Sequence, residues 1–258
     1  MSTNGAVIVG APVVAAPFVT SLPDLRRAFQ AGLPYRHVVI DGFLDEDLAR
    51  DLASGFPSLD DPQWKKRFHR HSKKLTLDEW LPVSAEGAID ALHSDAMLRW
   101  IENLTGMQDL RGDDALFGGG LHCVPSGGFL DVHADFSRHP VTGDQRVLNL
   151  LIYLNEDWDP LWGGALELWD AGVTKCLRSI QPAFNRAVLF ETHDRSFHGH
   201  PDPLACPPTI ARKSLALYYY RPAKAWDLVV PTTDYRARPH DYRARFRAWA
   251  GRLKRRIT

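Results

Sequence analysis

Seven short β-like segments follow one another from residue 115 onward, and this succession most constrains the fold. Glycine and proline interrupt the segments FGGGLHCV, GFLDVHADF, RVLNLLIYLN, GALELWD, KCLRSIQP, RAVLFET and RKSLALYYYR. Short strands at close spacing are typical of a β-sandwich or jelly roll. Helical patterns come earlier, over residues 22–32, 44–56 and 85–106, with a strand pattern over 36–44. We therefore predict an α+β, mainly β, fold with helices packed on a face of a double sheet.

The length of 258 residues suits one domain. We expect an N-terminal strand and helical part over 1–112, a β core over 113–222 and a basic C-terminal helix over 223–258. Residues 234–258 hold nine Arg or Lys and two Asp, and residues 240–257 have an amphipathic pattern. That helix either docks with a solvated cationic face or contacts an anionic surface, a phosphate-bearing substrate or a partner.

Charge and cysteine content restrict the functional class. The formal net charge is zero, so there is no overall signal for nucleic acid or a membrane surface. No apolar run reaches the roughly 18 residues of a membrane span, and the apolar start lacks the basic region of a signal peptide. Cys123, Cys176 and Cys206 form no CxxC pair. This argues against structural zinc and predicts reduced thiols in the cytoplasm. No sequence feature indicates the oligomeric state.

The stretch DVHADF, residues 131–136, places a histidine and an aspartate two residues apart. Alternate side chains of a strand point to the same side, so His133 and Asp135 would face one cavity. Two histidines and one carboxylate can hold Fe(II) on one face of an octahedron, which leaves three positions open. A His-x-Asp pair alone is weak evidence, because a histidine–aspartate hydrogen bond in a core or turn has the same spacing.

A third ligand is expected on another strand. SFHGH, residues 196–200, follows the apolar run RAVLF, and a curled sheet can bring it opposite His133. Three histidines compete for the role: His193, His198 and His200. We favour His198, at the entry to a strand, with His200 as the main alternative.

Arg212 and Ser214 lie in ARKSLALYYY and would face the same side of one strand. A guanidinium binds a carboxylate through two hydrogen bonds, so Arg-x-Ser after a metal histidine predicts a pocket for the far end of a chelating cosubstrate. In RVLNLLIYLN, Asn149, Leu151 and Tyr153 share one strand face. Tyr153 is either a second donor to that carboxylate or to a metal-bound oxygen, or a core tyrosine.

Residues 117–222 resemble the Fe(II)- and 2-oxoglutarate-dependent oxygenases of the prolyl hydroxylase-like branch. The resemblance is carried by HAD at 133–135, YLNEDWDPLWGGALELW at 153–169, IQPAFNRAVLF at 180–190, SFH at 196–198 and RKSLALYYY at 212–220, with VVIDGFLDEDLARDL at 38–52 in addition. It implies a double-stranded β-helix core, similar to jelly rolls and cupins. It also implies iron ligation by His133, Asp135 and His198.

The resemblance further implies that Arg212 binds 2-oxoglutarate, with Tyr153, Ser214 and Asn149 assisting. The implied activity is a dioxygenase that consumes O2 and hydroxylates an unactivated C–H bond, with succinate and CO2 as coproducts and ascorbate as a candidate reductant. Related halogenases carry a small residue in place of the carboxylate, so Asp135 favours hydroxylation.

The substrate class stays open among three readings. We favour a small molecule (an amino acid, sugar, nucleoside or natural-product intermediate), because the chain shows no appended recognition domain. The alternatives are a peptidyl or protein prolyl hydroxylase and a non-catalytic metal- or ligand-binding β-barrel. Residues 58–82 look polar and irregular, either a solvated loop or a lid over the site. Expected substrate-side residues are Trp64, Arg67, His69, Phe136 and Arg138.

Overall fold

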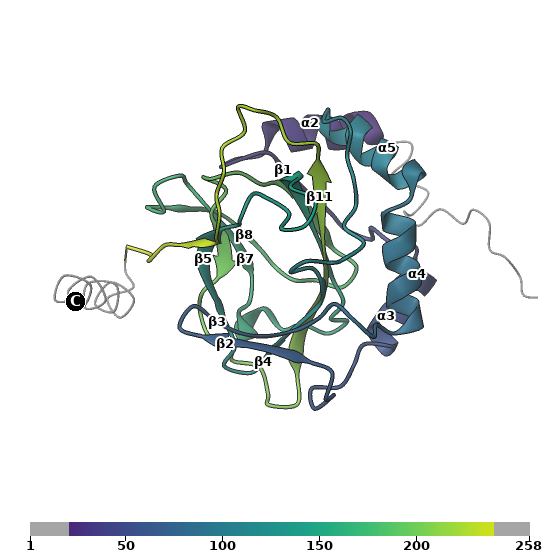
Figure 1. Cartoon of the computed structure of the whole chain (residues 1–258). Coiled ribbons are helices and arrows are strands. Elements are labelled where there is room, and N and C mark those ends of the chain that lie inside the picture. The colour runs from purple at the N-terminus through teal and green to yellow at the C-terminus, as the bar shows by residue number, and fades with distance from the viewer. Residues whose placement is uncertain (1–20, 240–258) are drawn as a thin grey trace, which may run out of the picture.

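The computed structural model describes residues 21–239. In this part of the chain twelve antiparallel strands form one sheet, in the order β1-β9-β6-β11-β4-β3-β5-β10-β7-β8, with β2 beside β3 and β12 beside β5. The strands are β1 (His37–Ile40), β2 (Lys65–His69), β3 (Ser72–Leu77), β4 (Gly120–Pro125), β5 (Leu130–Ala134), β6 (Gln145–Tyr153), β7 (Leu166–Trp169), β8 (Cys176–Ile180), β9 (Ala187–Glu191), β10 (His198–His200), β11 (Ala211–Arg221) and β12 (Asp234–Tyr235). The sheet curls on itself (Figure 1), which confirms the predicted double-stranded β-helix.

In the described part of the chain, four α-helices cover one side of the curled sheet (Figure 1). They are α2 (Leu22–Ala31), α3 (Glu46–Ser54), α4 (Val83–Leu92) and α5 (Asp95–Thr105), and a 3-10 turn η1 spans Pro160–Trp162. Helices therefore form where the sequence predicted them, and the pattern over 85–106 divides into two. Ser94 caps α5 by accepting a hydrogen bond from the amide of Met97, and Gly106 ends the helix with a φ of 78°.

The main core lies between the helices and the outer face of β6 and β11. Leu148, Leu150 and Ile152 of β6 belong to one buried cluster with Ile101 and Leu104 of α5. The intervening side chains of β6 point the other way, as strand alternation requires. The two faces of β6 thus separate a helix-facing core from the interior of the curled sheet.

Residues 65–77 form a regular hairpin, where we expected an irregular polar segment. β2 pairs with β3 in the register Lys65↔Thr76, Arg67↔Lys74 and His69↔Ser72. Leu75 and Leu77 are buried in the main core. The side chains of β3 that alternate with these leucines are polar because they face a polar cavity. The polar composition of the segment therefore hid the strand alternation in the sequence.

The segment after β11 returns to the middle of the sheet. β12 pairs with β5 through Asp234↔Ala134 and Tyr235↔His133. The apolar start of the sequence and the basic amphipathic pattern over 240–257 lie outside the described residues. Between residues 21 and 239 no helix has the length and apolar character needed to cross a membrane.

Candidate active site

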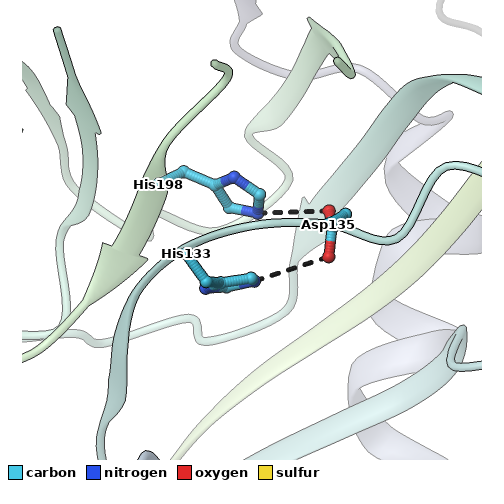
Figure 2. Close-up of side chains that lie close together, drawn as sticks. All are labelled: His133, Asp135 and His198. Carbon is cyan, nitrogen blue, oxygen red and sulfur yellow. Dashed lines mark ion pairs between the residues drawn. The ribbon is translucent and has the colours of Figure 1, made fainter. Parts of the chain in front are cut away.

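His133, Asp135 and His198, hereafter the ligand triad, converge from two strands that are far apart in the sequence. His133 lies in β5, Asp135 follows the last residue of that strand, and His198 begins β10 directly opposite His133. One potential ligand atom from each residue falls within a set no more than 4.8 Å across. Figure 2 shows both imidazoles pointing to the carboxylate, with each Nε2 at 3.5 Å from one oxygen of Asp135.

Backbone carbonyl groups fix the orientation of both imidazoles. Nδ1 of His133 lies 2.9 Å from the carbonyl oxygen of Asp131, and Nδ1 of His198 lies 2.9 Å from that of Ser196. If each Nδ1–H donates to its carbonyl, each Nε2 presents a lone pair to the centre of the triad. Burial, assisted by the neighbouring His133, lowers the pKa of His198 to about 4. The neutral form, which binds metals, is therefore present at neutral pH.

Arg146 and Asn149 of β6 hold the carboxylate of Asp135. Oδ2 of Asp135 accepts hydrogen bonds of 2.9 Å from Nη2 of Arg146 and from Nδ2 of Asn149. Burial raises the pKa of Asp135, but the charge of Arg146, assisted by the adjacent imidazoles, outweighs it and holds the pKa well below its usual range. The guanidinium of Arg146 lies 3.4 Å from the ring centroid of Tyr218. Asp135 is thus an oriented, ionised ligand.

These three side chains fit a ferrous ion. Two neutral nitrogen donors and one anionic oxygen donor on one side of a site leave the other side free, as in the facial triads of non-haem Fe(II) oxygenases. Among residues 21–239, they are the one group of three His, Cys, Asp or Glu side chains with ligand atoms in this proximity.

The triad opens onto a cavity of about 640 Å³, hereafter the chamber. Its walls come from the interior faces of the hairpin β2–β3 and of β4, β5, β6, β10 and β11. Thr233 and Tyr235 from the C-terminal segment also line it. This volume is in the range of small-molecule sites.

A second charged group lies deep in the same chamber, on β11. Arg212 is only 4% exposed, and its Nε donates to the carbonyl oxygen of Gly164 at 2.8 Å. Its Nη2 lies 3.1 Å from the hydroxyl of Tyr153, whose ring centroid is 4.7 Å from the guanidinium carbon. Ser214, two residues further along, also lines the chamber.

No carboxylate among the described residues pairs with Arg212. Burial lowers its pKa from the ordinary value, because a charged group loses its hydration there. A buried guanidinium without a protein counter-charge is a site for an anionic ligand. Gly164 makes room for it: the backbone has a φ of +74°, and a Cβ would lie 3.0 Å from Cδ of Arg212.

The remaining residues expected at the site divide into two groups. Arg67, His69 and Phe136 line the chamber. Trp64 does not, since its ring packs against Phe56 in the core and its Nε1 donates to the carbonyl oxygen of Ser58. Arg138 is also outside the lining, and its Nη1 donates to the carbonyl oxygen of Gly143.

The two histidines that competed with His198 for the role of third ligand, His200 and His193, lie in different places. His200 lines the chamber on the same strand as His198 but is not part of the triad. His193 lines a different cavity, beside Arg36 and Glu191. The bulge between His198 and His200 changes the register of β10 against β5. The register determines which histidine joins the triad, and it cannot be predicted from the sequence.

Sequence reasoning missed several polar residues of the chamber, among them Arg146, Lys74, Ser72 and Tyr235. Arg146 did carry a signal, since a cation at the start of the apolar run RVLNLLIYLN needs a partner if it is buried. Lys74 and Ser72 carried the signal of strand alternation with Leu75 and Leu77. Tyr235, which stacks on His71 at a centroid distance of 4.3 Å, reaches the site only through the pairing of β12 with β5.

Comparison with known proteins gives the same class as the geometry. Residues 119–220 match the family model of the 2OG-Fe(II) oxygenase superfamily. A prolyl-4-hydroxylase from Pseudomonas putida has 19% identity, with 77% of this chain and 100% of that chain covered and a TM-score of 0.52. A prolyl hydroxylase from Trichoplax adhaerens, in complex with a peptide fragment of the hypoxia inducible factor oxygen degradation domain, has 19% identity, coverage of 80% and 93%, and a TM-score of 0.55.

These two likenesses show the fold, a double-stranded β-helix of the prolyl hydroxylase type. Over residues 119–220 the chain matches an oxygenase domain of the 2OG-Fe(II) superfamily. The protein is accordingly a 2-oxoglutarate-dependent dioxygenase that uses Fe(II), with a ligand triad able to hold the ion.

Proposed function

We propose that the protein hydroxylates an unactivated C–H bond of a small molecule. His133, Asp135 and His198 hold Fe(II), and Arg212 binds the distal carboxylate of 2-oxoglutarate with help from Tyr153. The observation that carries this proposal is the buried guanidinium of Arg212, which pairs with no carboxylate of residues 21–239 and shares one chamber with the triad.

When bound, iron and 2-oxoglutarate supply the oxidation by O2, with succinate and CO2 as coproducts. The protein provides orientation and a protected site. Tyr153 accepts a hydrogen bond from Arg212 and fixes the guanidinium plane, and Ser214 offers a hydroxyl on the same wall. Asn149, which we expected beside the cosubstrate, instead holds Asp135. We therefore assign it a positioning role.

Three features support hydroxylation of a small molecule over the alternatives. Asp135 is retained and ionised, which leaves no ligand position for a halide at that corner. Arg212 argues against a non-catalytic metal-binding barrel. The hairpin and the segment with Thr233 and Tyr235 both contribute to the chamber wall, which favours a compact substrate over a long peptide. We further propose that the chain acts as one oxygenase domain in the cytoplasm, in keeping with its free cysteines.

Succinate formation and O2 uptake with added Fe(II) and 2-oxoglutarate test this function. Two panels are compared, one of small amino acids, sugars and nucleosides and one of proline-containing peptides. We expect turnover with the first panel. Turnover only with the peptides would support the prolyl hydroxylase alternative and contradict the proposed substrate class.

Two variants test the assigned roles in the same assay. Asp135→Ala should abolish turnover, and Arg212→Ala should sharply raise the concentration of 2-oxoglutarate required. Arg138→Ala is the matched control, because Arg138 is outside the chamber. Full activity of Asp135→Ala or an unchanged cosubstrate requirement of Arg212→Ala would refute these roles.

A further inference from the structure

The interior face of the β2–β3 hairpin carries a cluster of polar side chains that the proposed chemistry does not use. Arg67 and Lys74 are cross-strand partners, and so are His69 and Ser72. All four line the chamber. Because cross-strand partners point to the same side of a sheet, they form one patch on the chamber wall, which we name the hairpin patch.

Lys74 is a cation in the chamber that is not directly paired with a carboxylate of residues 21–239. Its ammonium makes no hydrogen bond or ion pair within residues 21–239. Arg67 reaches only the hydroxyl of Thr76, at 3.4 Å. By contrast, Lys65 pairs with Asp78 and Glu79. A buried cation is stable only if something compensates its charge.

Two further groups of the same wall have unused hydrogen-bonding capacity. Oγ of Ser72 and Nδ1 of His200 are buried without a partner in the described chain. Ser72 is 1% exposed and His200 is 5% exposed. Both residues lie opposite Leu130 of β5, one on each side of that strand, so they lie in one row across the sheet. A buried donor without a partner costs free energy unless a ligand satisfies it.

The net charge of the chamber lining also favours an anionic ligand. Its lining has five cations, Lys65, Arg67, Lys74, Arg146 and Arg212, against three carboxylates, Asp78, Glu79 and Asp135. Fe(II) and doubly ionised 2-oxoglutarate cancel each other. With both bound, an excess of two positive charges remains in the lining, and among residues 21–239 neither Lys74 nor the more exposed Arg67 has an ion pair with a carboxylate.

We propose that the hairpin patch is an oxyanion subsite that holds a carboxylate or phosphate group of the substrate. Lys74 and Ser72 are the principal donors, with Arg67 of the same patch beside them and His200 of β10, across β5, as an additional donor. This inference rests on the function proposed above and narrows the substrate to anionic small molecules. A substrate held there by its anionic group presents the rest of its skeleton to the chamber that the triad shares.

Inorganic sulfate and acetate are suitable probes, because they stand for a phosphate group and a carboxylate. Their binding is measured by calorimetry on the full chain loaded with Zn(II) and saturated with 2-oxoglutarate. We expect both probes to bind, and the tighter one identifies the type of anionic group. Lys74→Met should weaken binding about tenfold or more, the scale of one charge-assisted hydrogen bond.

Two further variants separate a ligand role from a structural one. Lys73→Met removes the same charge from the opposite face of β3, where Nζ bonds the carbonyl oxygen of Ser126, and should change probe affinity less than threefold. Ser72→Ala should weaken the probes but leave the ligand-free protein as stable as before, since the lost hydroxyl had no partner.

Absence of binding by both probes would overturn the subsite, as would equal losses in Lys73→Met and Lys74→Met. Competition between the probes and 2-oxoglutarate would also overturn it, since Lys74 would then belong to the cosubstrate pocket. The visible absorption band of the protein with Fe(II) and 2-oxoglutarate is recorded in parallel. Its absence in the wild type would refute the proposed function, whereas its presence with failed probe binding would refute the subsite alone.

Discussion

Nη2 of Arg146 lies 2.9 Å from Oδ2 of Asp135, and both side chains are buried. This ion pair is part of the candidate metal site and also of the core beneath it. Removing one partner of a buried ion pair leaves an uncompensated charge, which costs far more than the loss of a surface pair.

Arg146→Met should therefore lower the free energy of unfolding of the metal-free protein by about 3–5 kcal/mol. Chemical denaturation measures this. Arg111→Met is the control: its pair with Asp144 is on the surface, so its loss should cost about 0–1 kcal/mol. Added metal should reduce the defect of Arg146→Met, because the ion supplies a new counter-charge to Asp135. Equal stabilities of the two variants would show that the buried pair contributes no more than the exposed one.

Arg212→Lys tests whether the guanidinium binds the cosubstrate carboxylate through two hydrogen bonds. A lysine keeps the charge but cannot make two parallel hydrogen bonds to a carboxylate or stack on Tyr153 in the same way. We expect the KM for 2-oxoglutarate to rise about tenfold while kcat changes little. Steady-state succinate release measures both. A kcat that falls with KM unchanged would place Arg212 in the chemistry rather than in cosubstrate binding.

The pH dependence of anion binding should follow Lys74. Burial lowers its pKa to about 8, so the ammonium loses its proton as the pH rises through that value. The other charged or titratable side chains that line the chamber are Lys65, Arg67, His69, Asp78, Glu79, His122, His133, Asp135, Arg146, His198, His200, Arg212, Tyr218 and Tyr235. Sulfate affinity should therefore fall above about pH 8 in the wild type. Lys74→Arg should keep it, because a guanidinium stays protonated. If sulfate affinity fell above about pH 8 in both the wild type and Lys74→Arg, the pH effect would belong to another group.

Gly199 separates His198 from His200, and its backbone is in close contact with β5. A Cβ there would lie 2.8 Å from the carbonyl oxygen of Leu130 and 2.9 Å from that of Asp131. Gly199→Ala should push β10 away from β5 and weaken metal affinity at least tenfold, as measured by competition with a chelator. Gly87→Ala in α4, where a Cβ meets nothing, should bind metal normally and be slightly more stable. Unchanged metal affinity in Gly199→Ala would mean that the strand adapts without moving His198.

Most of the fold could be predicted from the sequence, and so could those relationships in the site that involve residues of a single strand. Strand alternation placed His133 with Asp135, and separated Asn149 and Tyr153 from their apolar neighbours, because these relationships need only one strand. The choice of His198 over His200 depended on a bulge between β10 and β5, which are more than sixty residues apart in the sequence. Such pairings depend on the whole sheet, so local patterns do not determine them.

The hairpin shows a different limit. Its polar residues suggested a loop, because strands are usually recognised by apolar residues on at least one face. Leu75 and Leu77 supplied such a face, but the opposite face meets a charged chamber rather than a core. Arg146 was overlooked for a related reason, since its partner Asp135 belongs to another strand.

The pairing of His198 with His133 across β10 and β5 has a consequence for assembly of the protein. If β10 slipped by one residue, Gly199 would take the place opposite His133, and His198 would turn to the other side of the sheet. The ion would then lose a donor. Metal binding therefore stabilises only the alignment that places His198 opposite His133. A molecule with misaligned strands would not retain the metal ion.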